Sequence, residues 1–253
     1  MLTTIVHGVL FVVLGAVVGA AGGVFGIGGG LIAIPMLAIV FGLDQQHAQG
    51  TALVMGAPNT LVALWRYAQH EHFDRRGATL LGIAGGPGTF AGAYFAVHFA
   101  GHNLRPAFGV FLVVLAVFLT ARTLRASPAP AERVVRHPAW IALLGLVAGT
   151  LSGVFSSGGA AFAVPFLSTY FGYAQATAQG MALGVVAPGS VIAMFTYGFA
   201  GAIDWPIAIP LALGGTLFIK QGVGLAHRLP ERTLRLLFGG LLVVSAIALF
   251  RTH

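Results

Sequence analysis

Long apolar runs separated by short polar stretches continue along the whole chain. A helix needs roughly 20 apolar residues to cross a hydrocarbon core of about 30 Å, and several of these runs have that length. The segments at 30–41 and 159–171 are too short for an easy crossing, because about 12 residues at 1.5 Å each span only some 18 Å. We expect these two to be re-entrant, or half-helices that begin within the membrane. In all, the pattern predicts ten hydrophobic segments, at about residues 4–22, 30–41, 48–65, 77–99, 106–121, 138–155, 159–171, 177–197, 205–226 and 233–250.

Each of the two short segments follows a glycine-rich interruption, which we call the first break (residues 26–30) and the second break (residues 156–160). The chain reads GVFGIGGGLIAIP from Gly23 and GVFSSGGAAFAVP from Gly153. A bilayer tolerates irregular backbone only where protein or water supplies hydrogen bonds, because lipid supplies none. A matching pair of Gly- and Pro-interrupted segments in two halves of a chain indicates the binding site of a transporter.

The two halves of the chain match without gaps at an offset of 130 residues. A self-similarity at one fixed period indicates a duplicated unit. Five segments per half is an odd number, so the two halves would have opposite orientations in the membrane. We predict an all-α polytopic membrane protein with two inverted-topology repeats, at residues 1–122 and 138–253, joined by a linker at 123–137. Matched pairs include Pro35/Pro165, Gln49/Gln179, Pro58/Pro188, Tyr67/Tyr197 and Asp74/Asp204.

Composition and charge agree with this class of protein. Hydrophobic residues make up 57% of the chain and charged residues only 8%, whereas soluble domains carry about a quarter charged residues. The net charge of +7 comes from arginines gathered in short polar stretches, which indicates membrane topology rather than nucleic-acid binding. Cysteine is absent, so disulfides, thiolate metal sites and cysteine nucleophiles are excluded. The expected partners are the lipid bilayer and a small ligand, with no cofactor, and association into a homodimer is left open.

The backbone at the two breaks is the first group of candidate ligand-binding residues. Each break opens a new helix, whose free N–H groups and positive dipole end attract anions. Glycines at four-residue spacing nearby (Gly15, Gly19, Gly23, Gly145, Gly149 and Gly153) are interpreted instead as helix-packing positions. The candidates at the breaks are Gly28, Gly29, Gly30, Ser156, Ser157, Gly158 and Gly159.

Polar side chains within the apolar segments form the second group. Gln49, Thr51 and Gln179 lie near segment starts, where helix capping is an equally good interpretation. Deeper polar groups should face the bundle interior or a cavity, and these are Asn59, Thr60 and Ser190.

Two further features of the segments carry predictions. Lys220 is charged within an apolar segment, so it either lines the pathway or extends toward water. The sequence Gly85-Gly86-Pro87-Gly88 predicts a flexible point in the segment at 77–99.

The stretch from Gly19 to Pro35, with a second copy from Gly149 to Pro165, resembles the TauE/SafE family of bacterial membrane transporters. The second copy departs from the first where Ser156-Ser157 replace Gly26-Ile27 and Ala160 replaces Gly30. The resemblance implies a multi-pass inner-membrane exporter of small anions, for which sulfite and organosulfonates such as sulfoacetate are the named substrates.

The expected mechanism is secondary transport by alternating access, since no ATP-binding motif is present. Two alternatives remain. The first is an intramembrane hydrolase that uses Ser157 as nucleophile, although a histidine base deep in a segment is lacking. The second is a membrane anion sensor or scaffold. We predict no catalytic residue and no metal ligand.

The arginine distribution gives a testable topology. Arginines gather at 66–76, 122–136 and 228–235, and the positive-inside rule places these stretches in the cytoplasm, with Asp44 and Asp204 on the opposite side. In intact cells, Ser127→Cys should therefore resist an impermeant thiol reagent, whereas Asp204→Cys should react. Labelling of Ser127→Cys without labelling of Asp204→Cys would reverse the assignment.

Overall fold

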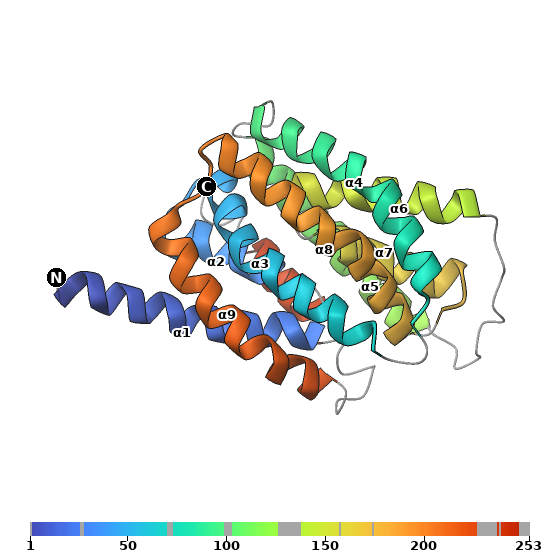
Figure 1. Ribbon diagram of the computed structural model, residues 1–253, viewed down its shortest axis with the longest axis horizontal. Coiled ribbons are helices and arrows are strands. Elements are labelled where there is room, and N and C mark those ends of the chain that lie inside the picture. Colours follow the sequence, from blue (N-terminus) through green and yellow to red (C-terminus); the bar gives the residue numbers. More distant parts are fainter. Residues whose placement is uncertain are drawn as a thin grey trace.

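The computed structural model is an all-helical bundle (Figure 1). It describes residues 2–25, 28–69, 73–98, 103–125, 138–156, 158–173, 175–226, 237 and 239–247. No strand occurs in these ranges. The helices are α1 (Leu2–Phe25), α2 (Gly30–Val40), α3 (Gln45–Tyr67), α4 (Arg75–His98), α5 (Leu104–Arg125), α6 (Pro138–Phe155), α7 (Gly158–Tyr170), α8 (Gln175–Phe199) and α9 (Trp205–Ala226), and residues 239–247 are also helical.

Helix length and hydropathy confirm a polytopic membrane protein. Within the described residues, four stretches are long and apolar enough to cross a bilayer: Gly8–Phe25, Arg75–His98, Pro138–Phe155 and Thr177–Phe199. Helix α2 has only 11 residues, so it extends about 16 Å and reaches only partway across. The prediction of two short segments after the breaks is confirmed by α2 and α7.

The helices of the two halves correspond in sequence but pack across the halves. Helices α3 and α8 begin 130 residues apart (175 − 45), and so do α4 and α9 (205 − 75). Helix α1 packs against α9, and α6, its counterpart in the second half, packs against α4. Figure 1 shows these two pairs on opposite sides of α3 and α8, which contact each other in the centre. Each outer group therefore combines helices from both repeats.

Glycines allow these helix pairs to approach through their backbones. A Cβ added at Gly19 would overlap the carbonyl oxygen of Gly215, and one added at Gly149 would overlap that of Gly85. Gly15, Gly145 and Gly153 likewise face backbone of the helix packed against them. The predicted packing role is confirmed for these five glycines.

The flexible point predicted at Gly85–Gly88 is wrong. Helix α4 continues through this stretch with Pro87 inside it. A Cβ at Gly85 would lie 3.0 Å from the carbonyl oxygen of Gly145, and one at Gly88 would lie 2.5 Å from that of Leu146. These glycines serve the contact with α6, which holds α4 in place.

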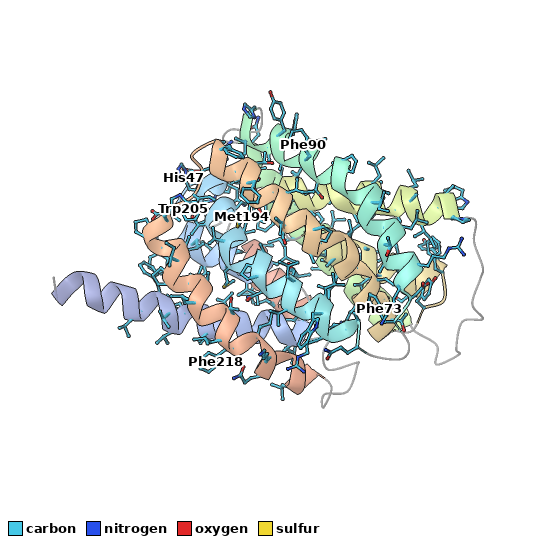
Figure 2. The ribbon with its side chains drawn as sticks, in the orientation of Figure 1. His47, Phe73, Phe90, Met194, Trp205 and Phe218 are labelled. Carbon is cyan, nitrogen blue, oxygen red and sulfur yellow. The ribbon has the colours of Figure 1, made fainter. Side chains whose placement is uncertain are left out.

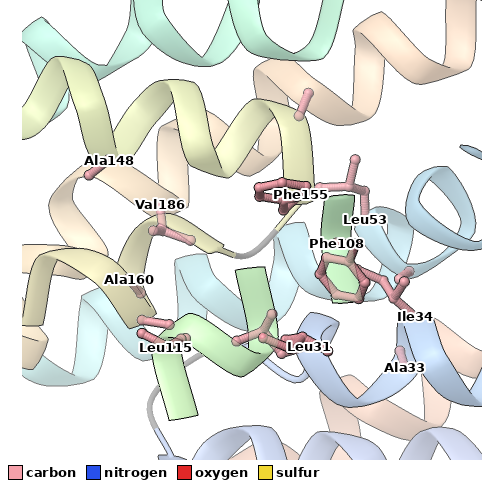
Figure 3. Packing of buried hydrophobic residues seen from close by; sticks show 14 of the residues in the cluster. Leu31, Ala33, Ile34, Leu53, Phe108, Leu115, Ala148, Phe155, Ala160 and Val186 are labelled. Atoms are coloured by element: carbon pink, nitrogen blue, oxygen red, sulfur yellow. The ribbon is translucent and has the colours of Figure 1, made fainter. Parts of the chain in front are cut away.

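An aromatic and aliphatic core fixes the end of α6, where the second break begins. The Phe155 ring lies 5.7 Å from the Phe108 ring and 4.7 Å from the Phe111 ring, both on α5. Figure 3 shows Phe155 and Phe108 beside Leu53 of α3, within one cluster of buried side chains. The second break is thus anchored from two neighbouring helices.

The bundle has two distinct ends. Figure 2 shows His47 and Trp205 together at one end and Phe73 at the other. At the first of these ends, the backbone N–H of Asp204 donates to Thr51 Oγ1 at 3.0 Å. Asp44 caps α3 there by accepting a hydrogen bond from the His47 backbone. Asp44 and Asp204 therefore lie at the same end, as the topology prediction requires.

Close backbone packing makes a stability prediction. Gly149→Ala should lower the free energy of unfolding by about 1–3 kcal/mol, because the added methyl group overlaps Gly85 and overpacking forces helices apart. Thermal unfolding in detergent measures this effect. Gly224→Ala is the control, since a Cβ there meets nothing within 4 Å. Equal melting temperatures for the two variants would contradict the packing role.

Candidate functional site

The backbone at both breaks adopts left-handed conformations. Gly28 and Gly29 have φ values of 70° and 89°, and Gly29 is the N-cap of α2. Ser156, with φ 62°, is the one non-glycine residue with positive φ in the described ranges. A side chain in this conformation costs roughly 1–2 kcal/mol, so the surrounding packing must hold Ser156 in place. Ser157 lies outside the described residues.

Close packing by itself requires glycine within each break. A Cβ at Gly28 would lie 2.5 Å from Thr60 Cγ2, and one at Gly158 would lie 2.9 Å from the Phe111 ring. A Cβ at Gly159 would overlap the carbonyl oxygen of Ala148. Anion binding by this backbone, including that of Gly29 and Gly30, stays a prediction.

Two equivalent hydroxyl groups meet at the centre of the contact between α3 and α8. Thr60 Oγ1 and Ser190 Oγ are 2.9 Å apart, and these residues correspond at the 130-residue offset. Contact between equivalent residues is the mark of a two-fold interface. Each hydroxyl also has a carbonyl acceptor in its own helix, Gly56 for Thr60 and Ala187 for Ser190. Because each hydroxyl carries one hydrogen, one of them donates to the other while the second donates to its own helix. The pseudo-two-fold axis therefore passes between Thr60 and Ser190.

Two tyrosine–glutamine pairs join α3 and α8 on either side of this centre. Tyr197 Oη donates to Gln49 Oε1 at 2.7 Å, and Tyr67 Oη donates to Gln179 Oε1 at 2.9 Å. Gln49 and Tyr67 are 18 positions apart on α3 (67 − 49), or about 27 Å, which is close to the thickness of the hydrocarbon core. We call this line of contacts the α3–α8 seam.

Several polar atoms near the seam are buried without a hydrogen-bond partner among the described residues. They are Gln49 Nε2, Asn59 Oδ1 and Ser152 Oγ, together with Nε2 and Oε1 of Gln45. The other amide atom of Asn59 is used, because Nδ2 donates to the carbonyl of Gly28 at 3.2 Å. An unpaired buried polar atom is destabilising, so these atoms are candidates for ligand contact.

The other predicted site residues differ in their location and contacts. Gln49 lies inside α3 and is fully buried, and Asp44 caps the helix, so the capping interpretation of Gln49 is wrong. Thr51 holds the loop before α9 through Asp204. Ser156 Oγ donates to the carbonyl of Gln49 at 3.4 Å and so ties the second break to α3. Lys220 is exposed on α9, outside the buried polar group.

Sequence reasoning missed three residues of this site. Tyr67 and Tyr197 matched at the 130-residue offset, but nothing local marked them as contacts between the repeats. Ser152 corresponds to Gly22 of the first repeat (152 − 130). A serine one turn before the second break was the sequence feature that could have identified it as a site residue. Long-range packing, rather than local pattern, gives all three their surroundings.

Inverted repeats around a buried polar seam are typical of multi-pass membrane transporters. The family model described as sulfite exporter TauE/SafE matches residues 11–249. This chain therefore belongs to the TauE/SafE family.

Several similar proteins from other organisms are described as probable membrane transporters. A probable membrane transporter protein of Methanocaldococcus jannaschii is 25% identical over 253 residues, covering 94% of this chain and 93% of the relative. Another from Bacillus subtilis is 24% identical over 251 residues, covering 89% and 91%, and one from Xylella fastidiosa is 29% identical over 242 residues, covering 93% and 91%. No solved structure matches the chain. The protein is a multi-pass membrane transporter.

The central hydroxyl pair is testable by a double-mutant cycle. Thr60→Val and Ser190→Ala should show a coupling energy of about 0.5–1.5 kcal/mol in thermal or denaturant unfolding, the range measured for hydrogen bonds between membrane helices. In the control cycle, Thr196→Val replaces Ser190→Ala. Thr196 donates to Ile192 of its own helix, so this cycle should be additive. Additivity in both cycles would mean that the two hydroxyls do not stabilise the seam.

Proposed function

We propose that this protein is a secondary transporter that exports small anions across the bacterial inner membrane by alternating access between its two repeats. Sulfite or organosulfonates such as sulfoacetate are the proposed substrates. The observation that carries the proposal is the α3–α8 seam, where equivalent residues of inverted repeats meet and several buried polar atoms have no hydrogen-bond partner among the described residues.

The chemistry of the seam suits an anion. Every buried polar side chain in the described part of the chain is neutral, including Gln49, Thr60, Ser152 and Ser190. Hydroxyl and amide groups donate hydrogen bonds to an anion, while a carboxylate in the same place would repel it. Membership in the TauE/SafE family supports the same class of substrate.

The seam also supplies a mechanism for access. Each end is closed by one tyrosine–glutamine pair, and hydrogen bonds between membrane helices contribute only about 0.6 kcal/mol on average. Opening one end breaks one pair while Thr60–Ser190 and the other pair persist. Because the two ends are related by pseudo-symmetry, opening the opposite end exchanges the roles of the pairs. Both pairs are formed in this structure, as the proposed mechanism expects for a state closed at both ends.

A binding screen followed by a flux assay tests the proposal. Purified protein is melted with sulfite, sulfoacetate, sulfate and choline chloride at matched ionic strength. A substrate at about 100 times its dissociation constant should stabilise the protein by about 2.7 kcal/mol. Proteoliposomes loaded with sulfite should then release it faster than protein-free liposomes.

The two assays separate the proposal from its alternatives. Stabilisation by sulfite without flux would favour a membrane anion sensor over a transporter. The absence of both stabilisation and flux for every sulfur anion would contradict the proposed substrate class.

A further inference from the structure

We propose that the transported anion is held at the second break by Gln49 Nε2 and Ser152 Oγ, and that Tyr197 positions the Gln49 amide for this contact. This inference rests on the proposed function and narrows it to one of the two breaks. It also assigns roles to Ser152 and Tyr197.

The Gln49 side chain presents an amide donor that the described part of the protein does not use. Gln49 is 0% exposed, and its Oε1 atom accepts the hydrogen bond from Tyr197 at 2.7 Å. The carbonyls of Gly153 and Val154 lie farther from the same hydroxyl, at 3.4 and 3.5 Å. The carboxamide is planar, so fixing its oxygen also fixes the direction of its NH₂ group. Nε2 has no hydrogen-bond partner among the described residues.

Ser152 places a second unused group beside the same break. Its side chain is 1% exposed, and its Oγ atom has no partner within the described ranges. A Cβ added at Gly159 would lie 2.9 Å from Ser152 Cβ, so Ser152 lies directly against the first turn of α7. Free N–H groups at a helix start attract anions. The Ser156 hydroxyl, bonded to the Gln49 carbonyl, ties Gln49 to this same stretch.

The first break has the opposite chemistry. Asn59 Nδ2 donates one of its hydrogens to the Gly28 carbonyl, and Oδ1 is the Asn59 atom without a hydrogen-bond partner among the described residues. An amide oxygen is an acceptor and does not bind an anion. The counterpart of Ser152 is Gly22, which has no side chain. Among the described residues, the buried atoms without a partner are therefore donors at the second break and an acceptor at the first, so the pseudo-symmetric scaffold carries an asymmetric site.

The donor role is tested by sulfite binding to purified full-length variants. Gln49→Glu keeps an acceptor for Tyr197 at the same reach but replaces the NH₂ donor by a carboxylate oxygen. We expect it to weaken sulfite binding by roughly 10–100-fold, as expected for losing a hydrogen bond to a charged group. Ser152→Ala should weaken it by roughly 10-fold on the same basis.

Two matched controls should bind sulfite within about twofold of the wild type. Gln221→Glu changes an exposed glutamine on α9. Ser168→Ala removes a hydroxyl that donates to its own helix at Val164. Melting temperatures without anion check that each variant is folded.

The positioning role of Tyr197 is tested by a cycle with Gln49. Tyr197→Phe should weaken sulfite binding by roughly 3–10-fold in the wild-type background and not at all in Gln49→Leu, because its effect passes through the Gln49 amide. Gln49→Met replaces Gln49→Leu if that variant does not fold. Tyr94→Phe, on the exposed face of α4, is the matched control. A purely structural role would lower the melting temperature in both backgrounds and leave no such coupling in affinity.

The outcomes separate the two proposals. If the wild type does not bind sulfite, the sulfite-binding part of the proposed function fails and this inference fails with it. If the wild type binds sulfite and Gln49→Glu and Ser152→Ala bind it equally well, only the assignment to the second break is overturned. An equal loss for Tyr197→Phe in both backgrounds overturns the positioning role.

Discussion

Backbone-to-backbone contact between glycine-bearing helices is the constraint on which the rest of this structure depends. Helices in a bilayer gain little by burying apolar side chains against one another, because lipid tails are equally apolar. Small residues allow close approach instead, and Gly19 against Gly215 and Gly149 against Gly85 provide it. These contacts hold α1 to α9 and α6 to α4. They leave α3 and α8 enclosed between the two pairs, where polar side chains are shielded from lipid.

Because α3 and α8 are enclosed between the two helix pairs, the α3–α8 seam can contain polar side chains. The same amides and hydroxyls would be destabilising if they faced lipid. Between the two helix pairs, some of them form hydrogen bonds with one another and others are candidates for ligand contact. Because the two breaks come from a duplicated unit, the differences between them show which features are specific to one break. Both breaks contain left-handed backbone, at Gly28 and Gly29 in the first and at Ser156 in the second. Asn59 and Ser152 each lack a counterpart side chain in the other repeat. Function specific to one break therefore depends on a few side-chain differences within a duplicated scaffold.

Much of this architecture could be predicted from the pattern of the chain. Segment lengths, the duplication and the buried positions of Asn59, Thr60 and Ser190 all follow from local sequence and one offset. The exchange of helices between repeats could not be predicted, because periodicity shows which segments correspond but not which ones touch. Gly85–Gly88 illustrates the difficulty: glycines that indicate flexibility in isolation are, beside α6, the condition for a continuous and closely packed α4. Ser152 and Tyr197 were missed for the same reason.

The pairing of α1 with α9 also has a consequence for biosynthesis. Helix α4 is complete before α6 emerges, so the second helix pair can form as soon as α6 is inserted. Helix α1 must instead wait until the chain has been extended by about 200 residues (226 − 25) to complete α9. At about 5–20 residues per second, the glycine face of α1 would lack this partner for roughly 10–40 s. During that interval the nascent first repeat is an incomplete assembly.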